Sequence, residues 1–195
     1  MPRYDQLKNK ILARSACVRY YQLETGRIAI PGQYWSLCGE QSTKDTSEIN
    51  QLVRLGLIRK NQFYGVDKNR FLIKRNMLNH PMAHWFHGEW SDVIYNQADF
   101  RPSIVFYDST GMMSTEQEKD TVRATLHLSP RGTFLFFTSM LNNPRRPSQK
   151  ITEKDITDIY ERISGFECCS QRRAVYVYHS TRHTRMIIHV FRKDH

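Results

Sequence analysis

The sequence has few cysteines, no long apolar run and no regular spacing of metal ligands. The four cysteines are Cys17, Cys38 and the adjacent Cys168 and Cys169, a pattern that does not make a disulfide framework. Without a Cys-x-x-Cys pair or regular Cys and His spacing, structural zinc is not expected either. The longest apolar runs, such as Thr133–Phe137 and Met186–Val190, have only the length of a strand, which excludes a membrane span. The polar, basic amino terminus has no apolar signal core. These absences predict a cytoplasmic protein with reduced thiols, no bound metal and no membrane contact.

Acidic residues are also scarce relative to basic ones. The chain has 29 Lys and Arg against 19 Asp and Glu, which gives a net charge of +10. An excess of this size attracts polyanions at long range, although a basic surface can also serve solubility alone. Clustering in expected loops favours nucleic acid, RNA or DNA, with candidate phosphate contacts at Arg145, Arg146, Lys150, Arg182 and Arg185.

Strand and helix patterns alternate along the 195 residues, a length that suits one domain with a full core. Residues 3–24 are expected to form a basic amphipathic helix with a buried stripe of Leu7, Ile11, Leu12, Cys17 and Val18. Strands are predicted at 34–37, 63–66, 83–86, 104–107 and 132–139, and helices at 47–57, 70–79, 91–97, 115–128 and 152–163. Residues 142–150, rich in Pro and Arg, are expected to form a loop.

The last two predicted strands, 174–178 and 186–191, have no room for a helix between them and should form an antiparallel hairpin. The predicted fold class is therefore α/β: a single-domain, doubly wound sheet of seven strands, mostly parallel, with a C-terminal antiparallel hairpin. In this organisation residues 1–32 form an N-terminal basic helix that packs on a Rossmann-like domain at 33–195.

Several predicted strand ends carry residues suited to a nucleotide. The first strand runs into Cys38–Gly39–Glu40, where glycine lets the backbone approach a ligand, and the second ends at Asp67, which can accept hydrogen bonds from both ribose hydroxyls. Gly88–Glu89–Trp90 follows the third strand and Asp108 ends the fourth. Ligands of open α/β sheets bind at the carboxyl ends of the strands, so these residues define one expected site.

This whole pattern resembles the class I S-adenosylmethionine-dependent methyltransferases, whose sheet has seven strands with the last one reversed. The resemblance extends from about Gln33 to Lys193 and lies in architecture and motif positions. It implies S-adenosylmethionine as the cofactor, with its methionine part against Cys38, Gly39 and Glu40, its ribose on Asp67, and its adenine against Gly88, Glu89 and Trp90. It also implies that Asp108 is the catalytic residue.

Two features depart from the family pattern. The first turn has a single glycine, and Glu40 beside it would either repel the cofactor's carboxylate or attract its ammonium group. Residues 108–111, Asp-Ser-Thr-Gly, lack the prolines and aromatic residue typical of exocyclic-amine methylation and the cysteine of cytosine C5 chemistry. No lysine follows the fifth strand at 138–140, so the tetrad typical of ribose methylation is not evident.

Three functions follow as hypotheses. The first is a methyltransferase that uses S-adenosylmethionine and acts on nucleic acid or on a partner bound to it. The second is a non-catalytic module that keeps the fold and binds nucleic acid or an acidic protein. The third, a nucleotide-dependent oxidoreductase, is disfavoured by the single glycine and the terminal hairpin.

Overall fold

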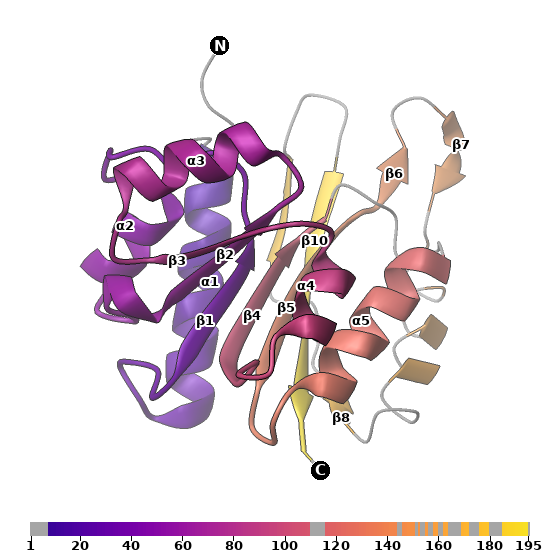
Figure 1. The fold of residues 1–195 in the computed structure, drawn as a ribbon. Coiled ribbons are helices and arrows are strands. Elements are labelled where there is room, and N and C mark those ends of the chain that lie inside the picture. Colours follow the sequence, from indigo (N-terminus) through magenta and orange to yellow (C-terminus); the bar gives the residue numbers. More distant parts are fainter. Residues whose placement is uncertain are drawn as a thin grey trace.

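The computed structural model describes residues 8–109, 116–143, 146–150, 152, 155, 158–159, 162–163, 169–171, 176–179 and 185–194. Its central sheet has the strand order β3-β2-β1-β4-β5-β10-β8, with β9 also paired to β10 (Figure 1). In the part of the chain so described, no helix is long and apolar enough to cross a membrane.

The first half of the sheet is parallel. It consists of β1 (Gln33–Leu37), β2 (Phe63–Asp67), β3 (His84–His87), β4 (Pro102–Asp108) and β5 (Phe134–Met140). Parallel neighbours need a crossover connection, and the crossovers carry α2 (Glu48–Arg54), α3 (Arg70–Asn79), α4 (Trp90–Asn96) and α5 (Glu116–Leu128), with a short 3₁₀ helix η2 (Lys60–Gln62) before β2. The predicted order of these elements is confirmed.

The carboxyl-terminal part of the sheet is antiparallel. β10 (Arg185–Lys193) runs against β5, and β9 (Tyr176–His179) pairs with the first half of β10, which confirms the predicted hairpin. β8 (Cys169–Gln171) pairs with the last residues of β10. β8 and β9 thus share one position beside β10, so the eight strands fill seven positions in the sheet. The sequence analysis missed β8, because Cys-Ser-Gln has no apolar alternation.

Residues 142–150, which were expected to form a loop, contain a second small sheet instead. β6 (Asn142–Asn143) and β7 (Arg146–Lys150) pair in an antiparallel arrangement, and Figure 1 shows them beyond the end of β5. The prediction was wrong because polar residues and proline indicate a loop, whereas the pairing here is formed by the backbone. The predicted helix at 152–163 lies mostly outside the described residues; within it, Ile159 and Ile163 are buried.

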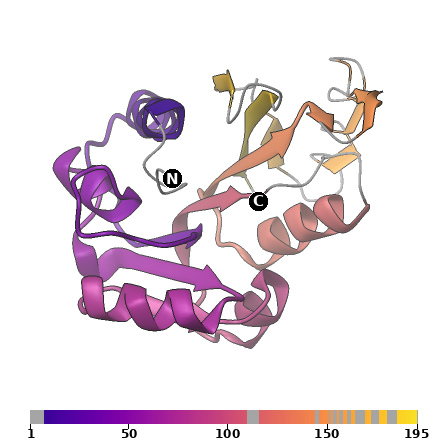
Figure 2. The ribbon, with the colours of Figure 1, turned by 90° about the horizontal axis from the view of Figure 1, so that it is seen from above.

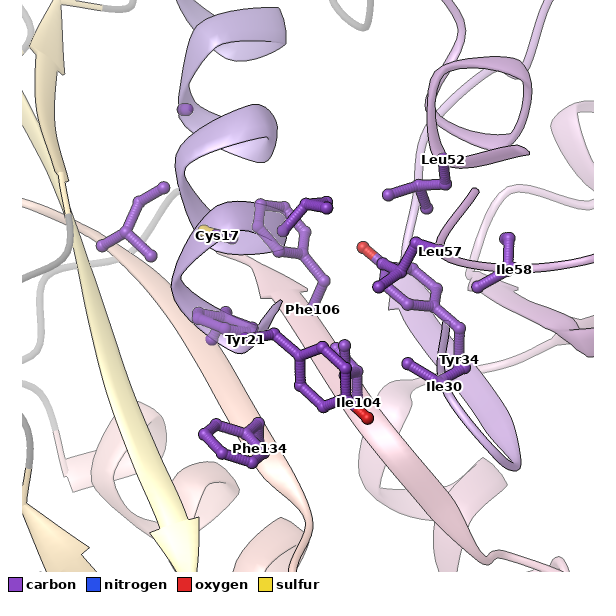
Figure 3. Packing of buried hydrophobic residues seen from close by; sticks show 14 of the residues in the cluster. Cys17, Tyr21, Ile30, Tyr34, Leu52, Leu57, Ile58, Ile104, Phe106 and Phe134 are labelled. Carbon is purple, nitrogen blue, oxygen red and sulfur yellow. The ribbon is translucent and has the colours of Figure 1, made fainter. Parts of the chain in front are cut away.

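The two faces of the sheet carry separate cores, because successive side chains of a strand point to opposite sides. Tyr34 of β1 belongs to the core beneath α1 (Lys8–Thr25), whereas Trp35 belongs to the core beneath α4 and α5. Figure 2 shows α1 and α5 on opposite faces of the sheet. In Figure 3, Cys17 and Tyr21 of α1 lie over the side chains of β4 and β5.

The buried face of α1 differs from the predicted stripe. Cys17 and Val18 are buried as expected, but Leu12 is 45% exposed, and Leu7 lies outside the described residues. Lys10 and Arg14 are buried in its place, and both have partners: Lys10 pairs with Asp108, and Arg14 donates a hydrogen bond to Gln51. The prediction failed because it assigned burial by apolarity, whereas a charged side chain can be buried when it is paired.

Candidate cofactor and catalytic site

A cleft of about 350 Å³ opens at the carboxyl ends of β1, β2 and β4. The chain leaves β1 toward β2 and later returns to β4 on its other side, so the cleft lies at the point where the strand order reverses. Every predicted cofactor-binding and catalytic residue except Glu40 lines it: Cys38, Gly39, Asp67, Gly88, Glu89, Trp90 and Asp108. The remaining lining residues are Leu37, Lys68, Tyr107, Ser109, Gln117, Glu118 and Thr121.

The turn after β1 presents its backbone to the cleft. The Cys38 N–H donates to the Val66 carbonyl at 3.2 Å, which extends the β1–β2 ladder by one residue. A Cβ built at Gly39 would meet no atom within 4 Å, so open space lies beside this backbone. Glu40 lies outside the cleft lining and instead accepts a hydrogen bond from Arg75 of α3 at 2.7 Å. It thereby ties the turn to α3.

Asp67 sits at the tip of β2, where its side chain is held by the following turn. One carboxylate oxygen accepts a hydrogen bond from the Asn69 N–H at 2.7 Å. Partial burial raises the pKa of Asp67, and the Asn69 hydrogen bond opposes that shift. The Asp67 carboxylate is therefore fixed at the edge of the cleft, in the position expected of a residue that binds a ribose.

The segment after β3 combines an exposed acid with a buried indole. Glu89 precedes α4 but makes no capping hydrogen bond, and its carboxylate lies 3.7 Å from the Lys68 ammonium. Trp90 is 3% exposed, and its indole N–H donates to the Thr125 hydroxyl at 2.9 Å. It also meets Tyr107 edge to face. Trp90 is thus a core residue that forms a wall of the cleft, and Glu89 stands at its rim.

Asp108, at the tip of β4, has partners from two other elements. The Thr138 hydroxyl of β5 donates to it at 3.0 Å, and it forms an ion pair with Lys10 of α1. The Lys10 and Asp108 side chains are 3% and 13% exposed, so this charge pair is nearly buried. Sequence reasoning missed Lys10, because a lysine in a basic helix is expected at the surface. The available signal was its spacing, four residues before Arg14 and seven before Cys17, on one helix face.

A second carboxyl group faces the cleft from α5. Glu118 lines the cleft and accepts a hydrogen bond from the Ser109 hydroxyl at 2.5 Å. Burial raises the pKa of Glu118, and burial likewise raises the pKa of Tyr107 beside it. A cleft carboxyl with a raised pKa is a candidate for proton transfer. The sequence predicted no role for Glu118, because an acid in the first turn of a helix is also favoured by the helix dipole.

The predicted nucleic-acid contacts remain predictions. Arg145 and Arg182 lie outside the described residues. The structure gives the backbone of the other three, with Arg146 and Lys150 in β7 and Arg185 at the start of β10.

No protein-family model and no curated protein sequence matches the chain. Solved structures match in fold. The plantazolicin methyltransferase BamL, in complex with a triazolic desmethylPZN analog and SAH, matches with a TM-score of 0.66 and 9% identity over 98% of this chain and 88% of its own. An S-adenosylmethionine-dependent methyltransferase from Clostridium acetobutylicum matches with a TM-score of 0.60 and 11% identity, over 98% and 96% of the two chains. The fibrillarin pre-rRNA processing protein of Methanococcus jannaschii matches with a TM-score of 0.59 and 7% identity, over 86% and 69%.

These matches agree with the strand order, in which β10 is reversed between β5 and the β8–β9 position. The chain therefore has the fold of the class I S-adenosylmethionine-dependent methyltransferases. Its low identity to each of these structures marks it as a divergent example of that fold.

Proposed function

We propose that the protein is an S-adenosylmethionine-dependent methyltransferase of the cytoplasm that acts on nucleic acid or on a partner bound to it. The observation that carries the proposal is the convergence of the predicted site residues in one acidic cleft at the reversal of the strand order. Asp67, Glu89, Asp108 and Glu118 line this cleft, against one lysine, Lys68, among the lining residues that the structure describes. A carboxylate-rich site favours a cofactor that carries a sulfonium and an ammonium group.

The cleft fits such a cofactor in size and in chemistry. Its volume of about 350 Å³ lies in the range of small-molecule sites. Asp67 would accept hydrogen bonds from the ribose hydroxyls, and the open space at Gly39 lets the backbone approach the methionine part. Trp90 would wall the adenine, with Glu89 beside it at the rim. Two of the matching methyltransferase structures contain SAH, the demethylated product of this cofactor.

The cofactor supplies a methyl group already activated by a sulfonium, so the protein must mainly align the nucleophile and accept its proton. Asp108 is the predicted base. Its ion pair with Lys10 places an ammonium group next to the reacting centre, where it stabilises negative charge on a nucleophile. Glu118, whose pKa is raised by burial, is a second group that accepts a proton in the same cleft.

The nucleic-acid substrate is supported by charge. The net charge of +10 favours a polyanion, and basic residues cluster in the carboxyl-terminal third of the chain. The fibrillarin match is itself a pre-rRNA processing protein.

One observation favours the non-catalytic alternative. The Asp108 carboxylate is already engaged by Lys10 and Thr138, as in a buried structural pair. In that case the protein would bind nucleic acid or an acidic protein without methyl transfer.

The test measures SAH binding by calorimetry and transfer of labelled methyl from S-adenosylmethionine to RNA and to DNA. Asp108→Asn and Glu118→Gln remove the two candidate proton acceptors, and Glu116→Gln, which alters an exposed acid of the same helix, is the matched control. We expect transfer to fall in the Asp108 variant while SAH and polymer binding persist. Polymer binding with no transfer by the parent protein would establish the non-catalytic module, and no SAH binding would refute the cofactor assignment.

A further inference from the structure

A second cleft, of about 430 Å³, opens at the opposite end of the sheet. Pro102, the first residue of β4, lines this cleft, whereas Asp108, the last residue of β4, lines the first. Six residue steps along a strand span about 20 Å. The two clefts are therefore separate sites.

Most charged residues in the described lining of this second cleft are arginines. Arg27 comes from the connection between α1 and β1, Arg101 precedes β4, Arg131 lies in the turn before β5, and Arg192 belongs to β10. Glu24 is the acid in the lining as the structure describes it. Four segments that are distant in sequence thus bring four guanidinium groups to one concavity, which we call the arginine cleft.

These arginines have only weak acidic neighbours in the described residues. Arg101 lies 3.7 Å from Asp99, with both side chains more than two thirds exposed, and such pairs contribute little. The Arg192 Nε lies 3.8 Å from an Asp194 oxygen, which is too long for a hydrogen bond. This buried nitrogen has no hydrogen-bond partner among the residues that the structure describes. A buried donor without an acceptor is costly, and an anionic ligand would relieve that cost.

The floor of the arginine cleft holds Arg192 in position but offers no ring for a base to stack on. The Arg192 guanidinium lies over the Phe134 ring, 5.6 Å from its centroid. Phe134 packs edge to face with Tyr21 at 5.3 Å, and Figure 3 shows these two rings next to each other. Both rings are buried, so the polar groups that the cleft exposes are mainly guanidinium and hydroxyl groups, beside the Glu24 carboxylate and the side chains of Pro31 and Pro130. Such a surface selects charge and not base identity.

We propose that the arginine cleft binds phosphate groups. Guanidinium groups bind phosphate oxygens through paired, charge-assisted hydrogen bonds. The cleft brings four of these groups into one concavity. The phosphates belong either to a nucleic-acid backbone or to a small phosphorylated molecule. Because this cleft lies about 20 Å from the first cleft, where we propose that the cofactor binds, only a polymer can reach both sites at once. The assignment is independent of methyl transfer.

The experiment compares two triple variants. Arg27→Ser, Arg101→Ser and Arg131→Ser together remove three exposed arginines of the cleft. Lys60→Ser, Arg70→Ser and Lys74→Ser together remove the same charge from exposed positions outside both clefts. Thermal unfolding and SAH affinity are measured for both variants, and both quantities should match the parent. A single Arg131→Glu variant provides the same test should the cleft triple fail to fold.

Pyrophosphate and a fluorescent single-stranded RNA are the two probes. We expect the cleft triple to weaken pyrophosphate binding by about tenfold or more, whereas the control triple leaves it unchanged. If the ligand is a nucleic-acid backbone, the slope of log affinity against log salt for RNA should also fall by about 2 in the cleft triple alone. Loss of pyrophosphate binding with an unchanged RNA slope supports a small phosphorylated ligand. No pyrophosphate binding by the parent, or equal losses in both triples, would overturn the proposal.

Discussion

The two clefts lie at opposite ends of β4 and carry opposite charge. Among the described residues, the cleft that we propose for the cofactor, here called the cofactor cleft, has four carboxylates in its lining against one lysine. The arginine cleft, counted in the same way, has four guanidinium groups against one carboxylate. A chain with a net charge of +10 thus concentrates acid at the carboxyl end of its parallel strands. The net charge of the chain therefore does not predict the sign of the charge in an individual cleft.

The clefts also differ in how their residues are supported. The cofactor cleft is built on the core: Trp90 is buried and hydrogen-bonded, and Asp108 is paired with Lys10 beneath α1. The arginine cleft has an exposed rim of Arg27, Arg101 and Arg131 around a buried floor. Loss of the buried Trp90 or of the Lys10–Asp108 pair should therefore disturb folding, whereas rim substitutions at the second cleft should disturb binding alone.

The largest expected effect is the loss of the Trp90 side chain. Trp90→Ala removes a buried indole and its hydrogen bond to Thr125, and should lower the free energy of unfolding by about 3–5 kcal/mol. Arg131→Ser, at the rim of the other cleft, should change it by less than about 0.5 kcal/mol. Urea unfolding of both variants measures the difference. Similar losses of unfolding free energy in the two variants would contradict the view that only the cofactor cleft is built on the core.

The next effect concerns the buried pair under α1. Lys10→Met leaves Asp108 without its cation and should lower the free energy of unfolding by about 3 kcal/mol, since a nearly buried charge then lacks a partner. The double variant Lys10→Met with Asp108→Asn should be more stable than Lys10→Met alone. Urea unfolding of the parent, both single variants and the double variant measures this coupling. Additive losses would show that the two side chains do not stabilise each other.

The residues of the cofactor cleft could be predicted from the sequence because each stands beside a recognisable local pattern. Each parallel strand is a short apolar run that ends in a turn, and Asp67 or Asp108 then stands at a position that the fold carries to one edge. The same reasoning placed Glu40 in the cleft, because position along the chain does not show that its side chain turns toward Arg75.

The features that were missed depend on contacts between distant segments. Lys10 and Asp108 are 98 residues apart, and an apolarity rule excludes a lysine from a buried helix face. Each arginine of the second cleft is alone in its own segment, so no motif joins Arg27, Arg101, Arg131 and Arg192. Only the packing of α1 and β10 beside the starts of β4 and β5 brings them together.

A smaller effect is expected at the ribose position of the cofactor cleft. Asp67→Ala should weaken SAH binding by about 1.5–3 kcal/mol, the usual contribution of a hydrogen bond to a charged group. Calorimetry measures the affinity, and thermal unfolding should move little because the acid stands at a strand tip. Binding of pyrophosphate at the arginine cleft is the internal control and should not change. An unaltered SAH affinity would remove Asp67 from the site.

Lowering the pH should affect ligand binding at the cofactor cleft without changing the charge of the arginine cleft. Burial raises the pKa of Asp67, so this carboxylate takes up its proton at a higher pH than an ordinary aspartate. If Asp67 accepts hydrogen bonds from both ribose hydroxyls, as proposed, protonation removes part of its acceptor capacity and its negative charge, so SAH affinity should fall as pH is lowered through that raised pKa. Calorimetry over a series of acidic buffers measures the fall, which the Asp67→Ala variant should lack. The arginines remain charged throughout this range.

The smallest effect is expected at Glu89, because its side chain is 64% exposed and lies 3.7 Å from Lys68. Glu89→Gln keeps the shape of the rim but removes one charge, and should weaken SAH binding by about 1 kcal/mol, the contribution of a single hydrogen bond in contact with water. Asp92→Asn, an exposed acid of the same helix that does not line the cleft, removes the same charge and is the matched control. Equal calorimetric affinities in Glu89→Gln and the parent would refute the adenine assignment of Gly88–Glu89–Trp90. Equal losses in both variants would instead mean that the acidic cleft attracts its ligand through overall charge, without a specific contact at Glu89.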